Sequence, residues 1–524
     1  MVGGCREAGT VRRGRCTNVA AGAIGMMLAL ACPQSYRTEA EEADGSISHD
    51  ADVPLDGESR DAAPIEDVPT GDDDSMPGDG SAVDGAAECP VWAVPDGSRS
   101  GDGTGSRDDP VNGVQRAFNG RGTCEHIILL RSADTPFSAR LDLRFAAGGS
   151  LVIEGDPDDP FRAELDAASG KGLIVAGPPD AVAETVTLRH LAVRHGRGDS
   201  GGCLELLAAP SSPVELHLED TEWTDCHASV DGGAVSVPAV AVTIEDSIFA
   251  DDSAGNKGGA IDINGMDRYS ADLVVERCWF QRDSARDGGA ISTWIEGWVA
   301  GAIRIEDSRF ADLSATDLAG ALLLEAGADV EIRGSRFDRI DARDAILVGV
   351  VGQLVFEHNV VADCAPRSGW AMDCMRAQSA TNNIFLRSSA LDAKHASNNV
   401  LIATGGTGAI LIGDELGRSV GNIIVDDWLA GTPGCDWVFH YLDHSNVWKS
   451  GVPVAADCLD RGNISVDPIF MNAAVEDFHL RPGSPCIDAG PPETEFNDPD
   501  GSRNDMGAFG GPGGTWTPLS ATPP

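Results

Sequence analysis

A six-residue pattern recurs along the middle of the chain and limits its possible folds more than any other feature. The copies are LEDTEW from residue 218, IEDSIF from 244, VERCWF from 275, IEDSRF from 305 and IRGSRF from 332, with a weaker FEHNVV from 356. Their starts lie 24 to 31 residues apart, so loop lengths vary while the pattern persists. Such a period is typical of a solenoid, in which each repeat buries its apolar side only against its neighbours.

Each copy alternates apolar and polar residues, which indicates a short β-strand and not a helix. A second apolar strand follows in the repeat, as GGCL from 201, GGAV from 232, GGAI from 258, GGAI from 288 and GAL from 320. The 63 glycines and 5% aromatic residues also suit short strands joined by many turns. The sequence therefore predicts an all-β fold, a single-stranded parallel β-helix whose successive coils lie about 4.8 Å apart.

The register of the repeat predicts which side chains stack inside this solenoid. We expect an aliphatic column of Ile244, Val275, Ile305 and Ile332. We expect an aromatic column of Trp223, Phe249, Phe280, Phe310 and Phe337. A third column should hold the small side chains of Thr221, Ser247, Cys278, Ser308 and Ser335.

Farther along the chain, the marker of each coil becomes asparagine before an apolar strand. The copies are Asn382-Asn383, Asn398-Asn399, Asn422, Asn446 and Asn463. Asparagine tolerates the left-handed backbone region that a sharp bend requires, and stacked amides can bond to one another. We interpret these asparagines as structural residues.

Both ends of the body carry motifs that resemble a known family. WAVPDGSRSGDGTGSRDDPV, from 92 to 111, resembles the N-terminal segment of many bacterial β-helix proteins, and GVQRAF from 113 should form the cap helix that follows it. DPIF from 467, DFHLRPGSPCIDAG from 477 and DPDGSRNDMGAFGGPGG from 498 resemble their closing segment. With the repeat, residues 90–514 thus resemble the pectate-lyase-like superfamily, which implies a right-handed parallel β-helix. The resemblance implies no single activity, since this scaffold carries lyases, hydrolases, epimerases and non-enzymatic surface proteins.

The first 31 residues are predicted to be a signal peptide. Arg12, Arg13 and Arg15 precede the short apolar run from 19 to 31, which is typical of an exported chain. Ala29-Leu30-Ala31 is an A-x-A cleavage site, but Cys32 follows it directly, so the segment also resembles a lipobox in which Cys32 is lipidated. Two locations follow: an outer-membrane or cell-surface lipoprotein that meets the membrane only through Cys32, or a secreted protein.

An acidic linker is predicted from 32 to 89. Between 39 and 88 Arg60 is the only base, and aromatic residues are almost absent, so this stretch cannot bury enough apolar surface to fold. We expect it to tether a β-helix of residues 90–466, a closing segment of 467–514 and a disordered tail of 515–524. The formal net charge of −45 argues against nucleic-acid partners and admits polyanionic substrates only through bridging cations such as calcium.

Of the 13 cysteines, Cys5, Cys16 and Cys32 lie in or directly after the leader. The remaining ten are an even number, which favours disulfides in an exported chain, although the sequence does not give their pairing. They are Cys89, Cys124, Cys203, Cys226, Cys278, Cys364, Cys374, Cys435, Cys458 and Cys486. Their spacing matches no zinc motif.

The residue after the aliphatic position of the repeat is glutamate in four consecutive copies. These residues are Glu219, Glu245, Glu276 and Glu306, and Glu357 follows after an interruption at Arg333. Stacked carboxylates repel one another, so the column requires cations, raised pKa values or basic neighbours such as Arg304. Two interpretations remain open: a face that binds cations or sugars, and the solvated charged face of an acidic protein.

Other groups of residues suit catalysis in type but match no family motif. The lyase branch uses calcium with an arginine or lysine base, and the residues of those types are Asp267, Arg268, Asp272, Glu276 and Arg277. The hydrolase branch needs paired acids near a histidine. Asp225, His227, Asp251-Asp252 and Asp426-Asp427 offer these but are interpreted as turn-capping residues.

Two further segments carry possible binding residues. Asp498, Asp500 and Asp505 are metal candidates, although Gly501 comes too early for an EF-hand loop and a glycine-rich closing turn is the alternative. An aromatic patch could stack on sugar or cover the last coils; it comprises Trp437, His440, Tyr441, His444 and Trp448. The leading hypothesis is a non-catalytic, exported protein of the cell envelope with a carbohydrate-binding or adhesion role. The alternative is a calcium-assisted polysaccharide lyase or a related carbohydrate-active enzyme such as a glycoside hydrolase.

Overall fold

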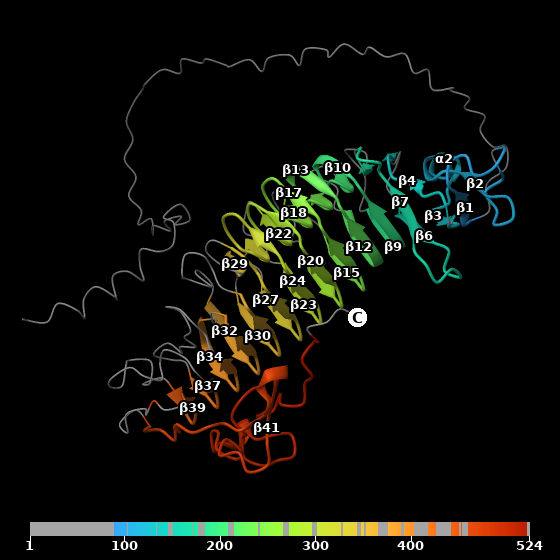
Figure 1. The fold of residues 1–524 in the computed structure, drawn as a ribbon. Helices are drawn as coiled ribbons and strands as arrows, with labels where there is room; N and C mark the ends of the chain where they lie inside the picture. The colour runs from blue at the N-terminus through green and yellow to red at the C-terminus, as the bar shows by residue number, and fades with distance from the viewer. Residues whose placement is uncertain are drawn as a thin grey trace, which may run out of the picture. The chain divides into compact units, whose positions relative to one another are not determined.

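The computed structural model is mostly β-structure with one short α-helix among the described residues, arranged as a parallel β-solenoid of about eight turns (Figure 1). The structure describes residues 89–101, 103–132, 134–144, 150–170, 172–176, 184–207, 214–238, 241–265, 272–295, 301–325, 329–342, 347–350, 353–364, 376–388, 392–402, 418–425, 442–449, 452 and 459–520. The predicted fold class is confirmed. The predicted signal peptide, Cys32 and the predicted linker up to residue 88 lie outside these residues. None of the described helices is long and apolar enough to cross a membrane.

The first described residues form the predicted N-terminal cap. Strand β1 (Val91–Val94) pairs in parallel with β2 (Val111–Asn112) and with β3 (His126–Leu129). Helix α2 (Val114–Gly120) follows β2, contacts these strands and buries Val114, Ala117 and Phe118. A disulfide between Cys89 and Cys124 joins the residues before β1 to those before β3. The cap helix expected from GVQRAF is therefore present.

Each regular coil contributes strands to three long parallel ladders. The first ladder runs through β3, β6 (Ser150–Gly155), β9 (Glu184–Arg194), β12 (Val214–Thr224), β15 (Val242–Glu245), β19 (Leu273–Glu276), β23 (Ala302–Glu306), β27 (Asp329–Arg333), β30 (Leu354–Glu357), β32 (Arg376–Thr381), β34 (Asp392–Ser397), β36 (Ser419–Val420) and β38 (Leu442–Asp443). The second ladder runs through β4 (Phe137–Ser138), β7 (Ala163–Asp166), the ends of β9 and β12, β16 (Ile248–Ala250), β20 (Trp279–Gln281), β24 (Arg309–Ala311), β28 (Arg336–Asp338), β31 (Val360–Ala362), β33 (Ile384–Leu386), β35 (Val400–Ile402), β37 (Ile423–Val425) and β39 (Asn446–Trp448).

The remaining strands complete the coils. The third ladder, which contains the GGAI segments, runs through β5 (Asp142–Arg144), β8 (Leu173–Ala176), β11 (Leu204–Leu207), β14 (Val235–Pro238), β18 (Ile261–Gly265), β22 (Ile291–Ile295), β26 (Leu322–Glu325) and β29 (Leu347–Val350). A short sheet precedes it, formed by β10 (Arg197–Ser200), β13 (His227–Asp231), β17 (Ser253–Ala254), β21 (Ser284–Ala285) and β25 (Ser314–Ala315). Figure 1 shows these strands side by side along the solenoid.

Sharp bends shape each coil, and the two on either side of the second ladder each need one residue in the left-handed backbone region. The first bend separates the first and second ladders; Asp246 (φ 49°) and Arg277 (φ 52°) occupy it in adjacent coils. The second bend follows the second ladder; Asp251 (φ 61°) and Arg282 (φ 59°) occupy it in the same coils. Aspartate, asparagine and glycine are well suited to this backbone region.

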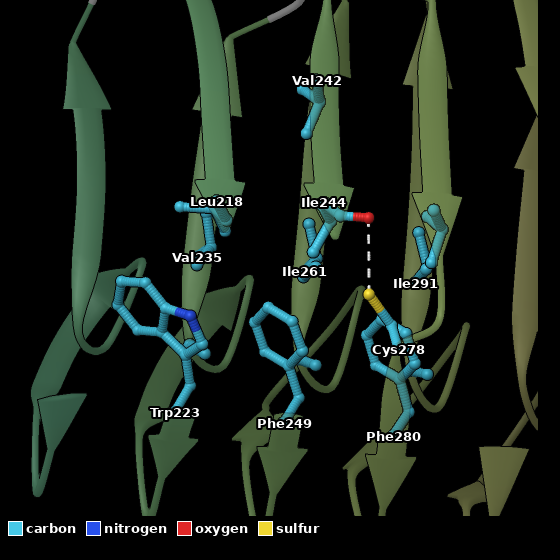
Figure 2. Packing of buried hydrophobic residues seen from close by; sticks show 14 of the residues in the cluster. Leu218, Trp223, Val235, Val242, Ile244, Phe249, Ile261, Cys278, Phe280 and Ile291 are labelled. Carbon is cyan, nitrogen blue, oxygen red and sulfur yellow. Dashed lines mark hydrogen bonds between the residues drawn. The ribbon is translucent and has the colours of Figure 1, made fainter. Parts of the chain in front are cut away.

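The interior columns form as the repeat predicts. The register aligns Ile244 with Val275, Ile305 and Ile332, all of them buried. The rings of Phe249, Phe280, Phe310 and Phe337 are stacked 4.8–5.0 Å apart and lie within 6° of parallel. Figure 2 shows Trp223, Phe249 and Phe280 in neighbouring coils beside the aliphatic column. One coil spacing therefore sets both the strand pairing and the aromatic stacking.

The column of small side chains continues into a buried asparagine ladder. Asn359, Asn383, Asn399 and Asn422 each accept the backbone N–H of the equivalent residue one coil earlier, at 2.9–3.0 Å. Their amide groups also donate to backbone carbonyls of the preceding coils, at 2.8–3.2 Å. The structural interpretation of the asparagines is thus confirmed for this ladder. Asn446 does not belong to the ladder, because Ser445 occupies the ladder position in that coil and accepts the N–H of Asn422.

The closing segment packs along the side of the solenoid. It contains β40 (Phe470–Asn472), the 3₁₀ turn η4 (Ala473–Val475), β41 (Asp477–Leu480) and the turn η5 (Thr494–Phe496). Phe478, Cys486, Met506 and Ala508 form a second hydrophobic cluster with outward-facing residues of the second ladder: Val360, Ile384, Val400 and Ile423. Asn382 and Asn398, in the left-handed region at first bends, donate to the backbone of Ala508 and Asp505. The segment therefore completes a second core outside the coils.

The cysteines are only partly paired. Cys203 and Cys226 form a buried disulfide between successive coils, in addition to the Cys89–Cys124 bond. Cys278, Cys364 and Cys486 are buried free thiols, so the expectation of disulfides is met by four of the described cysteines and not by these three. Burial raises the pKa of Cys278 to about 12, which keeps it a neutral packing residue. Cys374, Cys435 and Cys458 lie outside the described residues.

Candidate functional site

The predicted glutamate column exists in the first ladder. The register aligns Glu219 with Glu245, Glu276 and Glu306. The column extends further: Arg189 and Glu154 precede these residues, and Arg333 and Glu357 follow them. The alternation of the strands points all of these side chains away from the core, and the four glutamate side chains are 28–51% exposed.

Arg277 neutralises the middle of this column. It occupies the first bend of its coil, and its Nη1 lies 2.9 Å from Glu276 while its Nη2 lies 3.4 Å from Glu245. Its Nε donates to Asp246 at 2.8 Å. Hydrogen bonds to Asp246 and Glu276 raise the pKa of Arg277. Two stacked glutamates therefore share one guanidinium, which offsets their mutual repulsion.

The outer glutamates also have basic neighbours. Arg189 lies 3.6 Å from Glu219 and 2.8 Å from Glu154. Arg304 lies 3.5 Å from Glu306 within its own strand, and Arg333 binds Glu357. Sequence reasoning identified Arg304 as a basic neighbour but missed Arg189 and Arg277. The position of Arg277 at a bend places it over two coils. The face is thus a row of carboxylate–guanidinium pairs that offers fixed hydrogen-bond donors and acceptors.

The metal candidates of the closing segment are engaged in turn contacts. Asp498 accepts the backbone N–H groups of Gly511 at 2.5 Å and Asp505 at 3.0 Å. Asp500 accepts that of Ser502 at 2.9 Å, and Asp505 that of Asp488 at 2.7 Å. Across the described part of the chain, no three or more His, Cys, Asp or Glu residues are grouped so that they could hold a metal ion. The three aspartates organise the closing turns.

The described lyase-type and hydrolase-type candidates form two separate groups. The hydrolase-type residues Asp225, His227 and Asp251-Asp252 meet at the second bends of adjacent coils, where Oδ1 of Asp252 accepts the N–H of Cys226. Asp272 accepts the N–H of Ala302 at 2.8 Å, while Glu276 and Arg277 form the ion pair described above. Asp225 occupies a second bend and lies 2.7 Å from Nε2 of His227, whose Nδ1 contacts Ser253. Asp267, Arg268 and Asp426-Asp427 fall outside the described residues.

Two members of the predicted aromatic patch are described. His444 occupies a first bend, and its Nδ1 lies 2.7 Å from Asp443. Trp448 packs against the second hydrophobic cluster, which agrees with the interpretation of the patch as a cover of the last coils. Trp437, His440 and Tyr441 lie outside the described residues.

The third ladder contains an acid that sequence reasoning missed. Asp262 occupies an outward position of β18, where the register aligns it with Ser236 and Ser292. It is fully buried, and among the described residues neither carboxylate oxygen forms a hydrogen bond of good geometry. Burial, followed by the nearby charge of Asp231, raises the pKa of Asp262 to about 7. The available signal was the polar residue directly after the apolar one in GGAVS, GGAID and GGAIS.

Comparison with known proteins identifies no family for this solenoid. No protein-family model and no curated protein matches the chain. The parallel β-solenoid is therefore established by the structure, and the relationship to the pectate-lyase-like superfamily stays a prediction from sequence motifs. The function is therefore inferred from the side chains on the outer faces of the three ladders.

Proposed function

We propose that this chain is an exported protein of the cell envelope that binds carbohydrate, without catalysis, through the charged column of the first ladder. The observation that carries the proposal is the row of paired side chains from Glu154 to Glu357. Arg277, held among Glu245, Asp246 and Glu276, is its best-defined member. Rigid carboxylate–guanidinium pairs suit hydroxyl groups, which both donate and accept hydrogen bonds.

The repetition of the column favours a repeating ligand. Equivalent side chains follow one another at the spacing of parallel strands, about 4.8 Å, so a chain lying along the solenoid would meet similar groups at each step. The net charge of −45 opposes a polyanionic chain. A neutral or amino-sugar polysaccharide is therefore the proposed ligand class.

The N-terminal sequence supplies the proposed mode of display. Cleavage before Cys32 and its lipidation would anchor the protein, and the acidic linker of residues 32–89 would hold the solenoid away from the membrane. If Cys32 is not lipidated, the same solenoid is secreted. Metabolic labelling with a fatty-acid analogue, in the parent and in Cys32→Ser, tests the anchor.

Binding to insoluble and soluble polysaccharides tests the proposed ligand. The informative variant is Glu219→Gln/Glu245→Gln/Glu276→Gln/Glu306→Gln. Its matched control removes four exposed acids elsewhere: Glu125→Gln/Asp158→Asn/Glu493→Gln/Glu495→Gln. We expect the column variant alone to lose binding. Equal binding by both variants, or no binding by the parent to any neutral or amino-sugar polymer, contradicts the proposal.

A second candidate function, calcium-assisted polysaccharide lyase or a related hydrolase, rests on Asp262. A carboxyl group with a pKa of about 7 suits general acid–base catalysis. Its complete burial places this candidate second, because substrate would have to reach an enclosed side chain. Ultraviolet absorbance of unsaturated products from pectin, alginate or glycosaminoglycans, with and without calcium, tests it. Activity that disappears in Asp262→Asn would replace the binding proposal.

A further inference from the structure

A column of interior side chains follows the second bends. Directly after the left-handed residue, successive coils carry Cys226, Asp252, Asp283, Leu313 and Ile340, all buried. Cys226 is closed in its disulfide, and Leu313 and Ile340 suit an apolar interior. Asp252 and Asp283 are 0% exposed. Two carboxyl groups thus lie where the coils of Cys226, Leu313 and Ile340 place sulfur-containing or apolar side chains.

Within the described structure, one oxygen of each carboxyl group has a well-formed hydrogen bond. Oδ1 of Asp252 accepts the N–H of Cys226 at 2.9 Å, and Oδ1 of Asp283 accepts the N–H of Asp252 at 3.0 Å. Among the described residues, neither Oδ2 atom has a hydrogen-bond partner. An isolated carboxylate in such a place would cost several kcal/mol, so a buried acid without partners tends to stay neutral.

The surrounding charges are largely paired with one another, so Arg282 offsets only part of the effect of burial on Asp283. In the preceding coil, Asp225 is bound by His227 and Arg197. In their own coils, Asp251 and Arg282 form a two-point ion pair. In the following coil, Asp312 is paired with Arg339. Burial and then the neighbouring carboxylates raise the pKa of Asp252, and burial followed by Asp252 raises that of Asp283.

We propose that Asp252 and Asp283 are held as protonated carboxylic acids in the folded protein at neutral pH, and that they form a proton-dependent latch that joins the coils of β12–β13, β16–β17 and β20–β21. Loss of the protons at alkaline pH places two like charges one coil apart in the interior. The second bend then opens, and the N–H groups of Cys226 and Asp252 lose their acceptors. This device is independent of the proposed carbohydrate binding.

The free energy of unfolding should fall as the pH rises, because folding is linked to proton binding by Asp252 and Asp283. Both groups have a higher pKa in the folded chain than in the unfolded one, so the folded chain binds more protons. Their contribution to stability is complete below the ordinary pKa of aspartate and is lost as the pH rises through the folded pKa values. Between the ordinary pKa of aspartate and the folded pKa values, opening should become easier by about tenfold per pH unit for each proton released, and above the folded values it should change no further.

Infrared spectroscopy in heavy water tests the protonation directly. The variant is Asp252→Asn/Asp283→Asn, which keeps the accepting oxygen and removes the titration. The control is Asp246→Asn/Asp307→Asn, which removes two exposed acids at first bends of the same region. At pH 7 we expect the parent and the control to show a protonated-carboxyl band that is weaker in the Asp252/Asp283 variant; Asp262 contributes equally to all three. Equal bands in all three proteins would overturn the proposal.

Amide hydrogen exchange tests the latch. After correction for base-catalysed exchange, protection of the Cys226 and Asp252 amides should fall with rising pH in the parent and control and stay constant in the Asn variant. Protection that does not depend on pH in the parent also overturns the proposal. If the double variant does not fold, the single variants and the pH titration of the parent band still decide between protonated and ionised pairs.

Discussion

Arg282 binds both oxygens of the Asp251 carboxylate in the preceding coil, through Nε at 2.6 Å and Nη2 at 2.5 Å. The same relationship joins Arg339 to Asp312 and Arg387 to Asp363. From Asp251 to Arg387 the second bends therefore alternate aspartate and arginine from coil to coil. Each arginine binds the aspartate of the preceding coil. A shift of the strand register by one coil would place aspartate beside aspartate, so this pairing disfavours it.

Arg282→Gln should lower the free energy of unfolding by about 0.5–1 kcal/mol, because the pair is well aligned but half exposed to solvent. Urea unfolding of Arg282→Gln, Asp251→Asn and the double variant gives the coupling energy of the pair. The control is Arg286→Gln, whose nearest acidic oxygen is 3.6 Å away. A coupling energy of zero between Arg282 and Asp251 would show that the pair does not stabilise the fold and can only affect the choice of register.

Phe280→Ala should destabilise the solenoid strongly. The ring lies between Phe249 and Phe310, with centroids 4.9 and 5.0 Å away, and is fully buried. Removal of a buried phenylalanine side chain costs about 3–5 kcal/mol. Thermal and urea unfolding measure the loss, and Phe161→Ala, which removes a ring 62% exposed, should change little. Similar losses for both variants would contradict the stacked-column account.

Asn399→Ala should cost more than Asn399→Ser. Alanine leaves the N–H of Asn383 and the carbonyl of Ala380 without their partners, at about 1–3 kcal/mol for each buried unsatisfied group. Serine holds the same ladder position at Ser308, Ser335 and Ser445 and accepts the N–H in those coils. Unfolding experiments on both variants measure the difference. Equal stability of the two would show that the ladder hydrogen bond contributes little.

Calcium should bind the glutamate column more tightly when Arg277 is removed. In the parent, the guanidinium occupies the space between Glu245 and Glu276. Calorimetric titration should therefore give the highest calcium affinity for Arg277→Gln, a lower one for the parent and the lowest for Glu245→Gln/Glu276→Gln. Absence of calcium binding in all three would end the interpretation of this column as a cation site.

The closing segment should loosen as the pH rises through about 6. Burial, followed by the charge of Asp505, raises the pKa of Asp498 to about 6. Because this value exceeds that of the unfolded chain, its contribution is complete below about pH 4 and is lost as Asp498 ionises. Limited trypsin cleavage at Arg503 should accelerate between pH 5 and 7 relative to an unstructured substrate. Asp498→Asn should remove this dependence; an unchanged profile would assign it to another group.

Much of the fold could be predicted because each repeat carries the same local information. The alternation around Ile244 and Ile305 specifies short strands, and the recurrence of Phe280 and Phe310 specifies their stacking register. The expectation of disulfides was wrong for cysteines whose place in the coil leaves them no cysteine partner among the described residues. Cys278 has the residue type of a disulfide partner, but it lies in the column of small side chains and stays a free thiol.

The positions of the glutamates in the candidate site could be predicted from the sequence, but the ion pair that neutralises them and the raised pKa of Asp262 could not. The column from Glu219 to Glu306 follows from the repeat alone. The role of Arg277 depends on the left-handed bend that directs its guanidinium across two coils, and the character of Asp262 depends on complete burial of an outward position. The repeat marks Asp262 as a polar position after an apolar residue, but neither its burial nor the reach of Arg277 across two coils has a local signature in the sequence.

By itself the sequence determined the β-solenoid, its interior columns and its charged face, because each depends on a pattern repeated in every coil. Only the tertiary structure decided that the closing segment covers the outer face of the late coils, and that Asp252 and Asp283 lie in the interior. The physical reason is the same for both: burial depends on which distant segments or neighbouring coils exclude water from a residue. Strand alternation fixes the direction of a side chain but not the presence of a cover.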